Sequence, residues 1–125
     1  MPPRRRTDPR LGRDALRHWH ADPEGTDRAT RAAAVRFTLE ELAERAPGNS
    51  VEVRVPPYGV VQCVEGPRHT RGTPPNVVES DGETWLALVW GSTTWAEALA
   101  TGSLRVSGTR ADLSGLLPLT REVGP

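Results

Sequence analysis

The chain has a single cysteine, no lysine, no isoleucine and no long apolar run. One cysteine excludes an internal disulfide bond and a zinc site made of several cysteines. No apolar stretch approaches the roughly 18 residues of a membrane-spanning helix, and the basic start lacks the apolar core of a signal peptide. The 125 residues fit one main domain, and we expect a cytoplasmic protein.

The missing lysine and isoleucine concern the origin of the gene. All sixteen basic residues are arginine. Lysine and isoleucine have AT-rich codons, whereas alanine, arginine, glycine and proline have GC-rich codons and are plentiful here. The composition therefore indicates a bacterial gene of high GC content and carries no functional information.

Positive charge is concentrated at the start of the chain. Residues 1–17 hold six arginines and two aspartates, a net charge of +4, which the remainder balances to zero. A basic tail can bind nucleic acid or anionic lipid, but a solvated terminus is commoner, and no aromatic residue interleaves with Arg4–Arg6 as in single-strand binders. We expect no nucleic-acid partner, a mobile segment over residues 1–7, and a basic extension with a short helix over residues 1–25.

Two helices are predicted in the first half of the chain. The longer one should cover about residues 26–46, with Phe37 off its core-facing stripe and covered by the first helix. The first helix should have Asp8 as its cap and Pro9 at its first position. Its apolar face is expected to consist of Leu11, Ala15 and Trp19.

The hydrophobic period changes from 3.6 to 2 after residue 50. Val51, Val53 and Val55 alternate with polar residues, which predicts a strand with one buried face. We expect these valines to face the second helix and the strand to pair antiparallel with the next one. Further strands are predicted at about residues 60–65, 76–79 and 104–107.

Three short helical pieces are predicted in the second half. Ser80–Glu83 and Thr94–Glu97 both have the spacing of a capping box, and Gly91 and Gly102 are typical of the ends of the two helices that follow. A last helix is expected over residues 109–117. This order of elements predicts an α+β fold in which helices pack on one face of a small, mostly antiparallel sheet.

A series of motifs in the second half resembles a known family. The segment Asn76-Val77-Val78-Glu79-Ser80-Asp81-Gly82-Glu83 joins a strand to a capped helix, a second short helix follows, and Gly102-Ser103-Leu104-Arg105-Val106-Ser107-Gly108 forms a strand before a leucine-rich segment. This series resembles the C-terminal half of sterol carrier protein domains, and the valine-rich hairpin and long helix fit their N-terminal half. Residues 53–76 are similar to a bacterial, actinobacterial-type branch of "sterol carrier family" proteins. The resemblance covers about residues 26–120.

The resemblance implies a sterol-carrier-like domain over residues 26–125, with about five strands and a hydrophobic tunnel for fatty acids, acyl-CoA, sterols or phospholipids. The chain departs from the family in two ways. Met1 is the only methionine and Phe37 the only phenylalanine, so no Met/Phe-rich helix lines a roomy tunnel. The loop around His69 has no counterpart in the eukaryotic carriers. Both departures weigh against a sterol ligand more than against the fold.

The sequence contains little that suggests catalysis. His18 and His20 point about 160° apart on a helix, so they cannot bind one metal ion together. Cys63 lies among valines of a strand and is expected to be a buried structural thiol. Phosphate-binding glycine loops, nucleophile elbows and paired carboxylates are missing. We therefore expect that the protein is not an enzyme and that it binds no metal and no cofactor.

One polar cluster is a candidate site for a ligand head group. Arg68, His69 and Arg71 lie in a loop between strands that is longer than a hairpin needs. Two guanidinium groups, an imidazole and nearby backbone amides can bind a carboxylate or a phosphate. The alternative is that the arginines pair with surface acids such as Glu65 and Glu79.

The tryptophan-rich helix is a candidate for the apolar part of the site. Trp85 and Val89 share one face of this helix, and Leu86 and Trp90 share the opposite face. A helix that is apolar on both sides is either sandwiched in a core or lines a pocket. Both interpretations stay open from the sequence, with core packing the commoner outcome. If the helix does line a small apolar cavity, the residues expected to enclose it are Trp95, Leu99, Leu104, Leu113, Leu116 and Leu117.

We expect a non-enzymatic binding or carrier module for a small amphipathic ligand such as a fatty acid or acyl-CoA. The alternative is a protein-interaction or accessory domain whose cavity is filled by its own side chains. The oligomeric state does not follow from the sequence. The predicted ligand-binding residues are Arg68, His69 and Arg71 for the head group and Trp85, Leu86, Trp90 and Leu99 for the chain.

Overall fold

The computed structural model of the protein describes residues 6–66 and 76–120. Its N-terminal half consists of two helices and a strand hairpin, and its C-terminal half of shorter elements. In chain order these are α1 (Pro9–Ala21), α2 (Arg28–Arg45), β1 (Val51–Val55), β2 (Gly59–Cys63), β3 (Asn76–Ser80), α3 (Gly82–Trp90), α4 (Trp95–Thr101), β4 (Leu104–Ser107) and a 3-10 turn, η1 (Ser114–Leu116).

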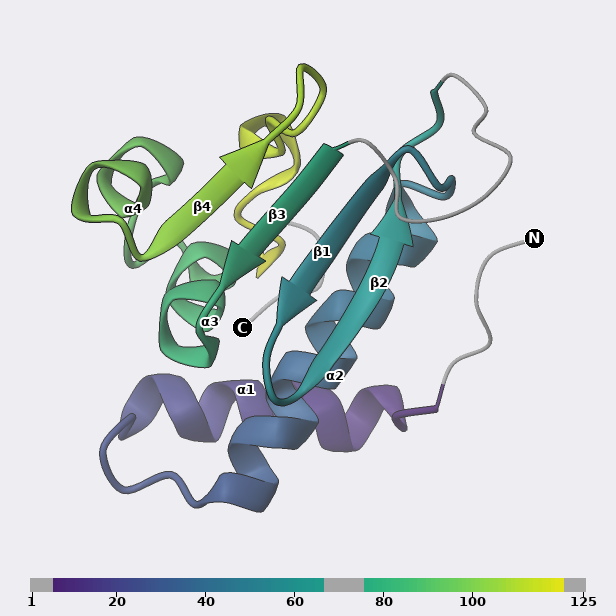
Figure 1. The fold of residues 1–125 in the computed structure, drawn as a ribbon. Coiled ribbons are helices and arrows are strands. Elements are labelled where there is room, and N and C mark those ends of the chain that lie inside the picture. The colour runs from purple at the N-terminus through teal and green to yellow at the C-terminus, as the bar shows by residue number, and fades with distance from the viewer. Residues whose placement is uncertain (1–5, 67–75, 121–125) are drawn as a thin grey trace.

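The described strands form one mixed sheet in the order β2-β1-β3-β4. β1 pairs antiparallel with β2, and β3 pairs antiparallel with β4, whereas β1 and β3 run parallel. Figure 1 shows α2 and α3 behind the sheet, while no helix of the described residues covers the face turned to the viewer. The α+β class with helices on one face is confirmed, with four described strands in place of the expected five or so.

The alternation along β1 places its valines in the core. Val51, Val53 and Val55 have no exposed surface and share one apolar cluster with Val35, Leu39 and Leu42 of α2. The polar residues between them point to the opposite face of the sheet. The predicted hairpin and its orientation toward the second helix are therefore confirmed.

The first helix packs against α2 through a glycine. Asp8 caps α1 by accepting a hydrogen bond from the backbone N–H of Arg10 at 2.9 Å. Gly12 lies against the ring of Phe37, which is fully buried. Coverage of Phe37 by the first helix is confirmed. Leu11 is 62% exposed, so its place in the apolar face was wrong. The buried face of α1 consists of Gly12, Ala15, Leu16 and Trp19, and Leu11 lies at the edge of this face.

The chain before α1 is attached to α2 at its described end. The backbone N–H groups of Arg6 and Thr7 donate to the carboxylate of Glu40 at 3.2 and 3.1 Å. The expectation of a mobile segment over residues 1–7 is thus wrong for these two residues, because a charged acceptor binds their amides. The first five residues lie outside the described part of the chain.

The helix caps in the second half agree with the sequence in one case and differ in the other. Thr94 and Glu97 form the predicted capping box of α4. At α3 the cap is Asp81, one residue after the predicted Ser80, and its carboxylate accepts from the backbone N–H of Thr84 at 2.7 Å. A carboxylate caps a helix at least as well as a hydroxyl group does.

The prediction of a helix over residues 109–117 is wrong. Only the turn η1 forms there, and Asp112 accepts a hydrogen bond from the backbone N–H of Ser114 at 2.9 Å. The segment is anchored beyond the turn, where the backbone N–H of Leu119 donates to the carbonyl of Val89 in α3 at 3.0 Å. Its buried residues alternate as in an extended chain: Ala111, Leu113, Leu117 and Leu119.

Candidate functional site

The predicted head-group residues Arg68, His69 and Arg71 lie outside the described residues, so their role stays a prediction. The two ends of their loop are described. A Cβ atom at Gly66 would lie 2.8 Å from Cβ of Ser50. At the other end, the side-chain amide of Asn76 donates to the carbonyl of Ser50 at 2.9 Å. The loop therefore starts and ends beside Ser50.

Two of the predicted chain-binding residues belong to the core. Trp85 and Leu86 have no exposed surface. The indole N–H of Trp85 donates to the hydroxyl oxygen of Thr38 at 2.9 Å, and that hydroxyl donates in turn to a backbone carbonyl of α2. In this conformation both side chains hold α3 against α2 and neither faces an open pocket.

The other two predicted residues lie apart from this core pair. Trp90 is half-buried and stacks on His20 of α1, with ring centroids 3.8 Å apart and planes tilted by 14°. Leu99 is 38% exposed on α4. The structure therefore does not bring the four residues together into one slot, and their role in ligand binding stays a prediction.

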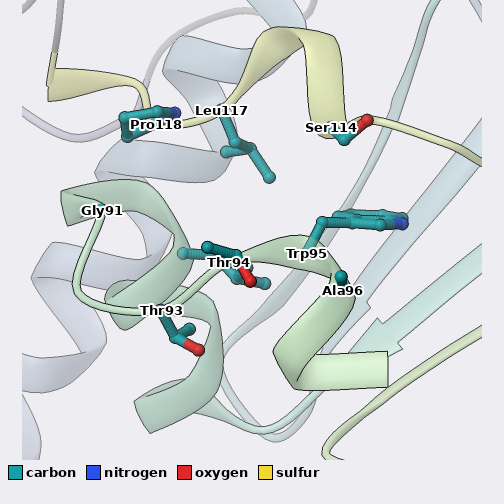
Figure 2. A pocket seen from close by; sticks show the side chains of 9 residues that line it. Gly91, Thr93, Thr94, Trp95, Ala96, Ser114, Leu117 and Pro118 are labelled. Carbon is teal, nitrogen blue, oxygen red and sulfur yellow. The ribbon is translucent and has the colours of Figure 1, made fainter. Parts of the chain in front are cut away.

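A pocket lies between α3, α4 and the segment around η1, and Trp95 and Leu117, two of the residues expected around an apolar cavity, line it. Its volume is about 400 Å³. In Figure 2, Leu117 points from the C-terminal segment toward Thr94 and Trp95, and Ser114 lies across from the indole of Trp95. We call it the α3–α4 pocket; its lining residues are Leu88, Gly91, Thr93, Thr94, Trp95, Ala96, Ser114, Leu117 and Pro118.

The α3–α4 pocket combines apolar walls with hydroxyl groups. Leu88, Leu117 and Pro118 supply aliphatic surface, and Thr93, Thr94 and Ser114 supply hydroxyl groups. Such a combination binds a ligand that has an apolar body and a polar end. No acidic or basic side chain is among the described residues that line it.

A negatively charged side chain, that of Glu97, lies next to this pocket. The carboxylate of Glu97 accepts from the backbone N–H of Thr94 at 3.0 Å. Hydrogen bonds from Thr94, and to a lesser extent from Thr93, hold the pKa of Glu97 below its usual range. The group is therefore ionised at neutral pH, and it disfavours an acidic head group at this end of the pocket.

A second pocket lies beside the described ends of the loop that carries Arg68, His69 and Arg71. It has a volume of about 470 Å³, and Val64 in its wall has a φ of 65°. A β-branched residue rarely adopts this left-handed conformation, and such strain is often found at functional sites. We call it the loop-end pocket; its lining residues are Ala46, Pro47, Val64, Glu65, Arg110, Asp112, Leu113 and Leu116.

The segment around η1 contributes to the walls of both pockets. Leu113 and Leu116 line the loop-end pocket, whereas Ser114 and Leu117 line the α3–α4 pocket. This arrangement differs from the predicted one, in which the segment is a helix with its leucines on one side. The alternation of apolar residues at 111, 113, 117 and 119 was the available signal.

Cys63 has the properties of a structural thiol, as predicted. It is fully buried in β2, and burial raises its pKa to about 12. The thiol therefore stays protonated at neutral pH and is a poor nucleophile. In the part of the chain that the structure describes, no cluster of three or more His, Cys, Asp or Glu side chains is placed to hold a metal, and no helix is long and apolar enough to cross a membrane.

Comparison with known proteins gives one family match. A family model described as a bacterial SCP ortholog matches residues 27–119. No curated protein matches the chain significantly. The matched region starts at the cap of α2 and contains both pockets, whereas α1 precedes it.

Proposed function

Because the chain belongs to the family of bacterial SCP orthologs, sterol carrier protein-like domains, we propose that it is a non-enzymatic carrier of an amphipathic, lipid-like ligand such as a fatty acid or acyl-CoA. The observation that carries this proposal is the α3–α4 pocket. It offers aliphatic walls and an indole beside three hydroxyl groups. A carrier of this kind needs apolar surface for the chain of its ligand.

The apolar part of the ligand is proposed to lie against Leu88, Trp95 and Leu117. Each methylene group that leaves water contributes about 0.8 kcal/mol to binding. A chain of several carbons therefore supplies enough free energy for binding without any charged contact in the pocket. The carboxylate of Glu97 keeps an acidic head group away from this end.

The head group is proposed to lie at the loop that carries Arg68, His69 and Arg71. The ends of this loop adjoin the loop-end pocket, since Glu65 lines that pocket and Asn76 accepts a hydrogen bond from the backbone N–H of Arg110 at 2.9 Å. An anion needs fixed donors at the boundary of an apolar site, because burying it unpaired is costly. The loop supplies two guanidinium groups for this purpose.

Filling the α3–α4 pocket is expected to weaken ligand binding. Ala96→Leu places a larger side chain in the space that the ligand would occupy, and we expect a loss of about 1.4 kcal/mol or more, which is about tenfold or more in the dissociation constant. Binding is measured as the change in tryptophan fluorescence on titration with palmitic acid. Trp95→Phe should abolish most of that change.

The matched control for this experiment is Ala100→Leu, the same substitution on the same helix at a position that does not line the pocket. It should bind palmitic acid as the unmodified protein does. Equal affinity of the Ala96→Leu and Ala100→Leu variants, together with an unchanged signal in Trp95→Phe, would place the ligand elsewhere.

Removal of the loop arginines tests the head-group site. Arg68→Ala combined with Arg71→Ala should weaken the binding of palmitic acid by about 1.5–3 kcal/mol for each charge-assisted hydrogen bond lost. The binding of hexadecanol, which has the same chain length, should be unaffected. Arg28→Ala, at an exposed position of α2, is the control. If acid and alcohol lose affinity equally, the loop does not bind the head group.

One observation favours a second function, that of an interaction or accessory domain without a lipid. Trp85 and Leu86 have no exposed surface, and the indole N–H of Trp85 is hydrogen-bonded to Thr38 of α2. Mass spectrometry of ligands extracted from the purified protein separates the two proposals. A co-purified acyl compound supports the carrier, whereas its absence combined with no response to palmitic acid supports the interaction domain.

A further inference from the structure

A stripe of arginines lies on the outward face of α1, outside the region that matches the family. Arg10, Arg13 and Arg17 follow one another at spacings of three and four residues, which places them within an arc of about 60° on the helix. Arg10 and Arg17 are exposed and Arg13 is half-buried. We call these three residues the basic stripe. The opposite side of α1 is buried in the core.

The charges of the basic stripe are largely unpaired. Arg17 pairs with Asp14 at 2.8 Å, and both side chains are about half exposed or more. Within residues 6–66 and 76–120 the structure gives Arg10 and Arg13 no acidic partner. Two guanidinium groups are therefore free to bind an anionic partner.

The position of the basic stripe is unfavourable for the helix itself. Arg10 and Arg13 lie in the first two turns of α1, where the helix dipole favours negative charge. The first turn contains no acidic residue. The carboxylate of the cap, Asp8, accepts the backbone N–H of Arg10, and further negative charge from a partner would also be favourable at this end of the helix.

The surroundings of α1 favour a protein over a membrane or a nucleic acid. A helix that lies in a membrane surface needs a free apolar face, but Leu16 and Trp19 of α1 are buried in the core. Single-stranded nucleic acid needs exposed aromatic rings, but Trp19 donates its indole N–H to Glu83 at 2.8 Å and Trp90 is stacked on His20. An acidic helix with carboxylates three and four residues apart has the same spacing as the stripe.

We propose that the basic stripe of α1 is a docking surface for an acidic helix of a partner protein. Guanidinium groups of Arg10, Arg13 and Arg17 pair with carboxylates of that helix, with geometry that favours two hydrogen bonds for each pair. The Asp14 carboxylate keeps Arg17 in place for this contact. The surface is separate from the α3–α4 pocket and does not depend on the proposed ligand.

The test uses a labelled, alanine-rich helical peptide with glutamates at positions i, i+3 and i+7, and an isomer with the same glutamates spread around the helix. Fluorescence anisotropy at low and moderate salt measures binding to the full chain. The striped peptide should bind more tightly than its isomer. Affinity should fall as salt rises, because exposed pairs are screened.

The double variant Arg10→Gln with Arg13→Gln should bind the striped peptide with about fivefold lower affinity, as expected for the loss of two exposed ion pairs. Its matched control is Arg54→Gln with Arg105→Gln, which removes the same charge from the outer face of the sheet and should leave the affinity unchanged. Equal loss in both variants, or equal binding of both peptides, would overturn the proposal. Tighter binding to duplex RNA or to vesicles containing phosphatidylglycerol would also overturn it.

Discussion

Trp85→Ala is expected to lower the free energy of unfolding by about 3–5 kcal/mol, the range found for tryptophan or phenylalanine removed from a packed core. Trp85 is fully buried between α3 and α2 and its indole N–H is hydrogen-bonded to Thr38. A domain of this size has a total stability of about 5–15 kcal/mol, so the loss is a large part of it. Urea denaturation measures the change through the midpoint at constant slope.

The matched control is Trp90→Phe, because Trp90 is half-buried and its ring stacks on His20 at the surface of α1. We expect it to change stability by less than about 1 kcal/mol. The pair of variants also distinguishes the two interpretations of the tryptophan-rich helix. If Trp85→Ala kept full stability but lost palmitic acid binding, Trp85 would line a ligand slot and the packed core would be refuted.

Gly12→Ala is expected to lower the free energy of unfolding by about 1–3 kcal/mol, although alanine is the better helix former. The added Cβ would lie 2.6 Å from Cδ1 of Phe37 and closer still to Cγ and Cβ of the same side chain. Phe37 is fully buried, so it has no room to move away. Overpacking of this kind outweighs the gain of about 1 kcal/mol from helix propensity.

A double-mutant cycle checks the cause of that loss. Gly12→Ala combined with Phe37→Leu should be less destabilised than the sum of the two single variants, since the smaller side chain makes room for the new methyl group. Simple additivity would mean that α1 and α2 do not meet at this pair. Urea denaturation of the four proteins supplies the measurement.

The elements with strong local signals were predicted from the sequence. Asp8 and Pro9 start a helix where the structure has one, and the valines of β1 alternate between core and solvent. These signals are local, because a cap satisfies amides within its own first turn and a strand alternates by its own geometry. The burial of Cys63 followed from the same alternation.

The candidate site was predicted only in part. The helix that contains Trp85 and Trp90 was identified, but its side chains point to different places: one into the core, the other onto His20. An apolar cavity that includes Trp95 and Leu117 was foreseen, but its other walls and its hydroxyl groups were not, because Leu117 and Trp95 approach each other only after the C-terminal segment folds back along α3. A contact between distant segments leaves no periodic signal in the sequence.

The sequence by itself determined the class of fold, the family, the bounds of most helices and the alternation of the valine-rich strand, because each depends on residues close together in the chain. The tertiary structure alone decided that β1 and β3 run parallel, that α1 meets α2 where Gly12 lies against Phe37, and that the segment after β4 is extended with one short turn. Apolar residues at 113, 116 and 117 suit a helix, while those at 111, 113, 117 and 119 suit an extended chain. The choice between them is made by the surface against which the segment packs, since local propensity yields to burial of apolar area in the core.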